Sequence, residues 1–423
     1  MRACPNCSRG GIPQRTRSVK FRADFPPHLS QQDDDMTYDF DKITDRKNTF
    51  AIKYDLAERR GKPADTISLW VADMDFPTAP CILKALSERV EHGVFGYSLP
   101  DERYYTAVKN WFRTRHNFEV QDDWIVNTPG VVFAISAAIR AFTQKGDGVL
   151  IQKPVYYPFF NTINTLERRV VNNPLVMRNG HYEIDFDDFE NKIVAEKVKL
   201  FIFCSPHNPG GRVWTQDELS RVSEICIRHN VIVVSDEIHS DIVFGENRHT
   251  IYASLSEAVL QNSVICTSPS KTFNLAGLQF SNIFIANPAL RKAFRKEIQF
   301  TGYDEPNIMG IAAAVAAYSQ GAEWFDQVKD YIWQNIVFAQ KYIQEHCPKI
   351  KVVVPDGTYL LWLDFSAFGL SAEEIDDRIL HKAKVWLDGG FMFGKEGAQF
   401  QRINCATPRT ILAAALERIC HEF

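Results

Sequence analysis

The sequence predicts an α/β fold, in which a mostly parallel β-sheet is covered by helices and a smaller α+β unit follows. Short β-branched runs alternate with longer amphipathic stretches from about Ile125 onward, a pattern typical of parallel strands joined by helices. The 423 residues are 45% hydrophobic, which is enough to fill the cores of one large and one smaller domain. Polar and turn-forming residues directly follow several apolar runs. Ligands of such sheets bind beyond the carboxyl ends of the strands, so these residues are the first candidates for a site.

Five short apolar runs are predicted to be strands of one sheet. Each is apolar enough to be buried on both faces, as the strands of parallel sheets usually are. The runs are residues 149–152, 200–204, 231–235, 264–267 and 282–286.

The smaller α+β unit is predicted from the C-terminal quarter of the chain. A long helix is expected over residues 324–346. Strands are expected over residues 351–354, 359–364 and 399–403.

Capping patterns mark three predicted helix starts. Two pairs have the spacing of a capping box, in which the side chains at the N-cap and N3 positions each bind the other's backbone N–H. These pairs are Thr215 with Glu218 and Ser371 with Glu374. Thr407 before Pro408 is typical of an N-cap followed by a proline at N1.

Four segments are predicted along the chain. Residues 1–35 are basic, then acidic, without a periodic apolar pattern, and are predicted to be a disordered leader or an added, non-native extension. Residues 36–80 are expected to fold back onto the small domain. Residues 81–320 are predicted to form the large domain and residues 321–423 the small one.

Composition argues against several classes of partner. The net charge is −4 and the charged residues are dispersed, so no nucleic-acid-binding face is expected. No apolar run reaches the length of about 18 residues that a membrane span needs, and no signal-peptide pattern is present, so no membrane partner is expected. Nine cysteines, many in apolar runs, indicate buried thiols and a cytoplasmic protein. Cys4 and Cys7 could form half of a zinc site, but no matching second pair follows, so no metal is predicted.

Chemically useful side chains follow three of the predicted strands. They are Asn208 after one strand, Asp236 and His239 after the next, and Ser268, Ser270 and Lys271 after the third. Before a predicted helix, the turn around Gly130 offers backbone N–H groups that can bind a phosphate. An amine, a carboxylate, an amide, hydroxyls and an anion-binding turn are therefore expected at one edge of the sheet.

Several of these segments together resemble the signature of the fold-type-I, class I/II aminotransferases, which depend on pyridoxal phosphate. The segments are Ser268-Pro269-Ser270-Lys271, Asn208-Pro209-Gly210 and the aspartate Asp236. More narrowly, the chain is similar to the carbon–sulfur lyase branch, which includes cystathionine β-lyases of the MalY/PatB type. The segments that carry this likeness are residues 70–76, 205–211, 236–239 and 270–278.

The resemblance runs from about Tyr38 to the C-terminus. It implies a large domain with a mostly parallel seven-stranded sheet between helices, and a smaller α+β domain. It also implies an enzyme that cleaves L-cystathionine or a related cysteine thioether to a thiol, pyruvate and ammonia.

The resemblance further implies roles for single residues. Lys271 would bind the cofactor and move the proton of the substrate α-carbon, Asp236 would pair with the pyridinium nitrogen, and Arg402 would bind the substrate carboxylate. Tyr156 would stack on the cofactor ring and Asn208 would hydrogen-bond its phenolic oxygen, and both would also contact the substrate. The other expected cofactor-binding residues are Gly130, Val131, Val132, His239, Ser268 and Ser270.

The chain departs from many aminotransferases at two positions. His239 stands where they have a tyrosine, which matches the lyase branch, and Gln279 stands where many have a phosphate-binding arginine. Tyr97 resembles a tyrosine that reaches the cofactor from a second subunit. The resemblance therefore implies a homodimer with shared active sites.

Other readings stay open at this point. An aminotransferase would need the same residues up to the removal of the α-proton, and a pyridoxal-phosphate-binding regulator of the maltose-regulator type would keep the cofactor but act by binding a protein. Taken singly, Lys271 could be a solvated surface lysine, Asp236 a helix N-cap and Arg402 half of a surface ion pair.

Overall fold

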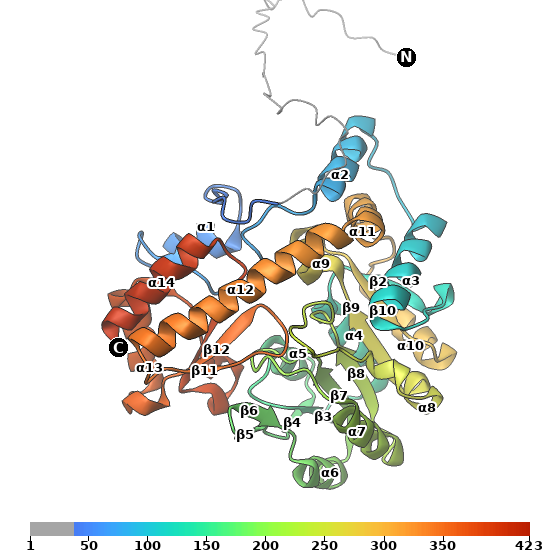
Figure 1. Cartoon of the computed structure of the whole chain (residues 1–423). Helices are drawn as coiled ribbons and strands as arrows, with labels where there is room; N and C mark the ends of the chain where they lie inside the picture. Colours follow the sequence, from blue (N-terminus) through green and yellow to red (C-terminus); the bar gives the residue numbers. More distant parts are fainter. Residues whose placement is uncertain (1–37) are drawn as a thin grey trace, which may run out of the picture. The chain divides into compact units, whose positions relative to one another are not determined.

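The structure, a computed structural model, describes residues 38–423, and the predictions for residues 1–35, including Cys4 and Cys7, lie outside them. Its largest sheet has seven strands (Figure 1). In spatial order they are β2 (Ile125–Thr128), β10 (Ser281–Phe284), β9 (Ser263–Thr267), β8 (Ile232–Asp236), β7 (Val198–Cys204), β3 (Gly148–Ile151) and β4 (Arg169–Asn172). Strand β10 is antiparallel to both neighbours and the remaining ladders are parallel. The predicted mostly parallel sheet is confirmed.

All five strands predicted for this sheet are present, with ends that differ by a few residues at most. Strands β2 and β4 complete it. Strand β4 lies at the edge of the sheet and exposes Arg169, so it lacks the continuous apolar run that marks the central strands.

Helices cover both faces of the large sheet. Successive side chains of a strand point to opposite faces, so Leu200 and Ile202 belong to one buried cluster and Phe201 and Phe203 to another. The first cluster includes residues of α4 (Val131–Phe142), α5 (Pro158–Thr165) and α10 (Pro288–Phe300). The second includes residues of α3 (Glu102–His116), α6 (Phe186–Ala195), α7 (Gln216–Arg228), α8 (Glu257–Gln261) and α11 (Ile308–Gln320).

The C-terminal part forms the predicted α+β unit. Its antiparallel sheet has the order β11 (Lys351–Val353), β12 (Leu360–Asp364), β15 (Phe400–Asn404) and β14 (Asp388–Gly389). Its helices are α12 (Ala322–His346), α13 (Ala372–Asp377) and α14 (Arg409–Glu422), of which α12 is the long helix predicted from the sequence (Figure 1).

The helix starts follow the capping patterns with one exception. Both predicted capping boxes are present, at the first turns of α7 and α13. The prediction of an N-cap at Thr407 is wrong, because α14 begins at Arg409 and its N-cap is Pro408. Thr407 is fully buried and its hydroxyl binds no backbone N–H of the described residues, so the helix starts one residue later.

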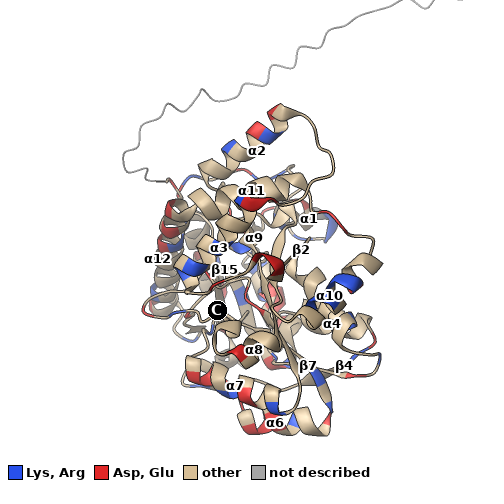
Figure 2. Cartoon of the chain, turned by 90° about the vertical axis from the view of Figure 1, so that its right-hand side faces the viewer, with Lys and Arg blue, Asp and Glu red and all other residues tan. Residues whose placement is uncertain are grey.

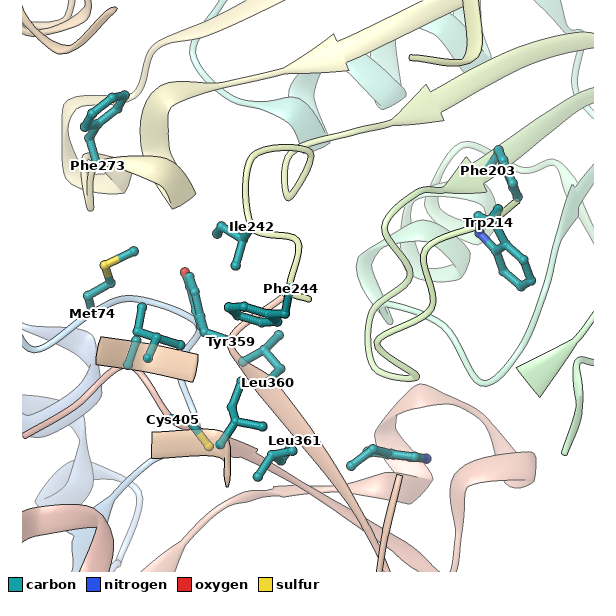
Figure 3. Packing of buried hydrophobic residues seen from close by; sticks show 14 of the residues in the cluster. Met74, Phe203, Trp214, Ile242, Phe244, Phe273, Tyr359, Leu360, Leu361 and Cys405 are labelled. Atoms are coloured by element: carbon teal, nitrogen blue, oxygen red, sulfur yellow. The ribbon is translucent and has the colours of Figure 1, made fainter. Parts of the chain in front are cut away.

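The segment before β2 contacts the C-terminal unit. After α1 (Ile52–Arg59), strand β1 (Ile67–Ser68) pairs in parallel with β13 (Val385–Trp386), and α2 (Pro80–His92) follows. The large and small sheets also share one buried cluster. Figure 3 shows Ile242 and Phe244, from the loop after β8, beside Tyr359 and Leu360 at the start of β12. The domain boundaries at residues 80 and 320 stay a prediction.

Charges of both signs are interspersed over the outer helices in the view of Figure 2. Within residues 38–423, no helix has the length and apolar character needed to span a membrane. A hairpin of β5 (Val176–Arg178) and β6 (His181–Glu183) completes the strands of the structure.

A buried ion-pair cluster fixes the segment that precedes the site. Lys53 is fully buried and its Nζ lies 2.7 Å from Asp75 Oδ2, while Arg46 Nη1 lies 2.8 Å from Asp75 Oδ1. Burial alone would raise the pKa of Asp75, but Lys53 and Arg46 hold it below its ordinary value. Removing one partner of a buried ion pair leaves an unpaired charge in the interior, which is far more costly than losing an exposed pair.

We therefore expect Asp75→Ala to lower the free energy of unfolding by about 3–5 kcal/mol. Asp65→Ala is the matched control, because it removes an exposed pair with Lys384, which water screens, and should cost far less. Chemical denaturation of the cofactor-free protein measures both losses. Equal losses for the two variants would show that the cluster around Asp75 is no more important than a surface ion pair.

Candidate active site

One cavity, of about 420 Å³, lies at the carboxyl-end edge of the large sheet. Strands β7, β8 and β10, the loops after β3 and β9, and the turn before α4 all contribute residues to it. Ten of the residues predicted from the sequence line it: Gly130, Val131, Val132, Tyr156, Asn208, Asp236, His239, Ser268, Ser270 and Lys271. Segments far apart in the chain therefore meet in one place, as expected for the strand ends of an open α/β sheet.

Lys271 presents a buried amine to this cavity. It lies on the single-turn helix α9 (Pro269–Thr272), which follows β9 and is capped by Ser268. Its Nζ donates a hydrogen bond to the carbonyl oxygen of Ala72, at 2.5 Å. Burial lowers the pKa of Lys271 to about 8, although the charges of Asp73 and Asp236 oppose this shift. A larger fraction of this amine than of an ordinary lysine is therefore unprotonated near neutral pH, which favours its action as a nucleophile or base.

Asp236 ends β8 and places a carboxylate in the same cavity. Its Oδ1 accepts a hydrogen bond from the backbone N–H of Ile238, at 3.2 Å. Burial raises the pKa of Asp236 to about 7, against the effects of that hydrogen bond and of the Lys271 charge. A buried carboxylate of this kind is stabilised by a cationic N–H group, which is what a protonated pyridine nitrogen offers.

His239 is a neutral neighbour of these two groups. Burial, and then the positive charges of Lys271 and Arg402, hold the pKa of His239 well below its ordinary value. Its Nδ1 atom is buried and has no hydrogen-bond partner among the described residues. A ligand in the cavity can satisfy this atom. The ring lies 5.8 Å from that of Tyr359, whose hydroxyl donates to Ala72, the same carbonyl oxygen that binds Lys271.

Arg402, on β15, lies beside the cavity residue Asn208. It is only 3% exposed, its Nη1 donates to Asn208 Oδ1 at 3.0 Å, and its Nη2 donates to the carbonyl oxygen of Trp70 at 3.0 Å. The same Nη2 forms an ion pair with Asp388, which faces Arg402 across the β14–β15 ladder. The Nε atom of Arg402 is buried and has no partner within residues 38–423. This free N–H is available to an anion such as a substrate carboxylate.

The turn before α4, which also lines the cavity, has the features of a phosphate site. Gly130 is the N-cap of the twelve-residue helix α4, and no side chain caps its first turn. The N–H groups there have no intrahelical partner, and the helix dipole favours an anion. The Ser268 hydroxyl already makes two hydrogen bonds within the protein. It donates to the carbonyl oxygen of Phe280 and accepts from the backbone N–H of Ser270. Gln279 lines the cavity where the resemblance would otherwise place an arginine.

Three residues that contact the site residues were not predicted from the sequence, and one predicted site residue does not line the cavity. Ala72 acts through its backbone carbonyl, Tyr359 ends a loop in the small domain, and Asp388 lies on a two-residue strand. The pairing of Asp388 with Arg402 arises from the register of two short strands, which a sequence pattern does not reveal. Tyr97 is 96% exposed and does not line the cavity of this chain.

Pyridoxal phosphate fits this set of groups. Lys271 can bind its aldehyde, Asp236 can pair with its ring nitrogen, and the first turn of α4 can hold its phosphate. Nδ1 of His239 and Nε of Arg402 are buried polar atoms without a hydrogen-bond partner among residues 38–423, and both can bind polar groups of a ligand.

Comparison with known proteins gives a consistent picture. Residues 64–419 match the model of the family described as aminotransferase class I and II. Cystathionine β-lyase PatB of Bacillus subtilis is 43% identical over 380 residues, which cover 90% of this chain and 98% of that protein. Protein MalY of Escherichia coli is 33% identical over 89% of this chain and 96% of its own length.

Solved structures agree with these relatives. Cystalysin from Treponema denticola, which contains pyridoxal 5'-phosphate, superposes with a TM-score of 0.89 at 37% identity, over 92% of this chain and 99% of that one. The pyridoxal-phosphate-bound C–S lyase from Staphylococcus hominis superposes with a TM-score of 0.85 at 32% identity, over 92% and 98% of the two chains.

Proposed function

Because this chain belongs to the aminotransferase class I and II family, we propose that it is a pyridoxal-phosphate-dependent carbon–sulfur β-lyase. It cleaves L-cystathionine or a related cysteine thioether to a thiol, pyruvate and ammonia. Relatives that bear the name cystathionine β-lyase match it over most of their length, which supports this reaction. The observation that carries the proposal is the meeting of Lys271, Asp236 and Asn208 in one cavity, with Arg402 bound to Asn208.

Pyridoxal phosphate, when bound, supplies an electron-accepting ring that stabilises negative charge at the substrate α-carbon. Lys271 binds the cofactor and takes the proton from the α-carbon, for which an amine with its pKa lowered to about 8 is suited. Asp236 keeps a proton on the ring nitrogen. Arg402 binds the α-carboxylate and orients the substrate, so that the thiolate leaves from the β-carbon. His239, which is neutral, adds no charge beside the ring.

The direct test is the release of thiol and pyruvate from L-cystathionine by the purified protein supplied with pyridoxal phosphate. Equal amounts of thiol and pyruvate are expected. Absence of both products, for L-cystathionine and for simpler S-alkyl cysteines, would contradict the lyase assignment.

The active form is a homodimer in which Tyr97 of each chain reaches the site of the other. The support is an exposed apolar segment between α2 and α3: Val94, Phe95, Tyr97 and Leu99 are 60%, 58%, 96% and 71% exposed. Apolar side chains grouped in this way on a surface usually mark a protein interface.

Mixing two impaired variants tests this arrangement. Lys271→Ala and Tyr97→Ala homodimers should each be impaired, the second by roughly 10–100-fold if a charge-assisted hydrogen bond is lost. A mixed dimer contains one site with both residues intact. Activity after unfolding and refolding the two together should therefore exceed the sum of the separate activities. If mass spectrometry detects mixed dimers but their activity does not exceed that sum, Tyr97 does not contribute to the active site of the other chain.

A further inference from the structure

Two stacked indole rings lie directly beside the arginine of the site. The rings of Trp70 and Trp386 are 4.4 Å apart with an interplanar angle of 16°. Trp70 accepts a hydrogen bond from Arg402 through its carbonyl oxygen, and Trp386 precedes Asp388, the partner of Arg402, by two residues. Both indoles are largely buried, so together they form a firm apolar wall next to the Arg402–Asp388 pair.

A second guanidinium lies on this wall. Arg60 follows the last residue of α1, and its Cζ lies 5.1 Å from the ring centroid of Trp70 and 5.9 Å from that of Trp386. Its side chain is exposed, and none of the carboxylates that the structure describes forms an ion pair with it. Cation–π contacts thus hold Arg60 in place without neutralising its charge.

The positive charge of Arg60 affects the pKa values of two residues close to the site. Burial raises the pKa of Asp388, and the positive charges of Arg402 and then Arg60 oppose that rise. Burial likewise raises the pKa of Tyr157, the neighbour of the cavity residue Tyr156, and Arg60 is again among the opposing charges. Arg60 therefore lies close enough to Asp388 and Tyr157 for its charge to act on both.

The rim carries an excess of positive charge. Lys62 lies 5.0 Å from the ring centroid of Trp386, and the negative charge of Asp376 acts to raise the pKa of Lys62 against the lowering by burial. Arg402, Arg60 and Lys62 thus face the two carboxylates of Asp388 and Asp376. These three cations exceed the two carboxylates by one charge, so this rim favours an anionic substrate.

We propose that Arg60 determines substrate specificity by binding an anionic group on the leaving thiol, such as the distal carboxylate of L-cystathionine. The inference rests on the proposed function and adds to it the class of thioether that is preferred. Trp70 separates the two guanidiniums, with Arg402 on its backbone carbonyl and Arg60 on its ring. The methylene groups of the thioether can pack against the indoles between them. Substrates whose leaving thiol is uncharged gain nothing from Arg60.

The experiment compares L-cystathionine with S-ethyl-L-cysteine, whose leaving thiol carries no charge. Arg60→Met removes the charge but keeps an unbranched apolar side chain on the indoles. Arg59→Met is the matched control, because Arg59 is the preceding residue and its side chain is also exposed. The ratio of kcat/KM for cystathionine over S-ethylcysteine should fall roughly tenfold in Arg60→Met, mainly through KM, and stay unchanged in Arg59→Met. Arg60→Lys should retain part of the preference.

A binding measurement separates this inference from the proposed function. In the Lys271→Ala background with pyridoxal phosphate supplied, calorimetry should show that Arg60→Met weakens L-cystathionine binding by a similar factor and leaves S-ethylcysteine binding unchanged. Equal losses for both compounds, or no loss for either, would overturn the role of Arg60. Failure of the wild type to cleave either thioether would contradict the lyase assignment, and the binding comparison would still decide the role of Arg60.

Discussion

Replacing Lys271 by alanine is expected to reduce pyruvate release from L-cystathionine by at least about 10⁴-fold. The substitution removes both the covalent link to the cofactor and the base that takes the α-proton, and no other lysine lines the cavity among the described residues. The rate of pyruvate formation under saturating substrate measures the loss. A second readout is covalent retention of the cofactor after borohydride reduction and denaturation, which should be lost together with activity.

Lys84→Ala is a suitable control, because this lysine on α2 is exposed and does not line the cavity. It should retain full activity and the covalent cofactor. Pyruvate release by Lys271→Ala at a rate near that of the wild type would remove the basis for assigning the imine-forming role to this amine.

Replacing Asp236 by asparagine is expected to lower kcat by roughly 10²–10⁴-fold with a smaller change in KM. An amide at this position keeps the size of the side chain but has no charge with which to hold a proton on the ring nitrogen. The effect should therefore appear in the chemical step rather than in substrate binding. Steady-state kinetics at saturating pyridoxal phosphate measure it.

The same substitution should stabilise the cofactor-free protein at neutral pH. Burial raises the pKa of Asp236 from its ordinary value to about 7, so the folded protein holds this proton more tightly than the unfolded chain does. The contribution of Asp236 to stability is then greatest below the unfolded pKa and is lost as the pH rises through about 7. Because asparagine does not titrate, the Asp236→Asn variant should not lose this stability as the pH rises through about 7. A variant that is less stable than the wild type at pH 8 but fully active would contradict both parts of the prediction.

Much of the fold could be predicted because the central strands are buried on both faces. Such strands are continuous apolar runs, and polar residues at their carboxyl ends stand out in the sequence. Lys271, Asp236 and Asn208 were found in this way, and the cavity brings them together. The exposed edge strand β4 has no such run, and the start of α14 depends on the burial of Thr407, which local sequence does not report.

The groups that were missed act through tertiary register or through the backbone. Asp388 contacts Arg402 because β14 and β15 are paired, and Ala72 binds Lys271 with a carbonyl oxygen that any residue would supply. Tyr359 directly precedes β12 of the C-terminal sheet, and its hydroxyl donates to the same carbonyl oxygen. Sequence patterns locate residues along an element but do not report which elements meet.

The most direct test of the central claim is the fate of L-cystathionine with and without an added keto acid. A β-lyase and an aminotransferase share the removal of the α-proton, but only the lyase then expels the thiolate. We predict that pyruvate, ammonia and homocysteine form in equal amounts without any keto acid, and that adding one does not increase substrate consumption. Consumption that requires a keto acid and yields an amino acid from it, without pyruvate, would show instead that the chain is an aminotransferase.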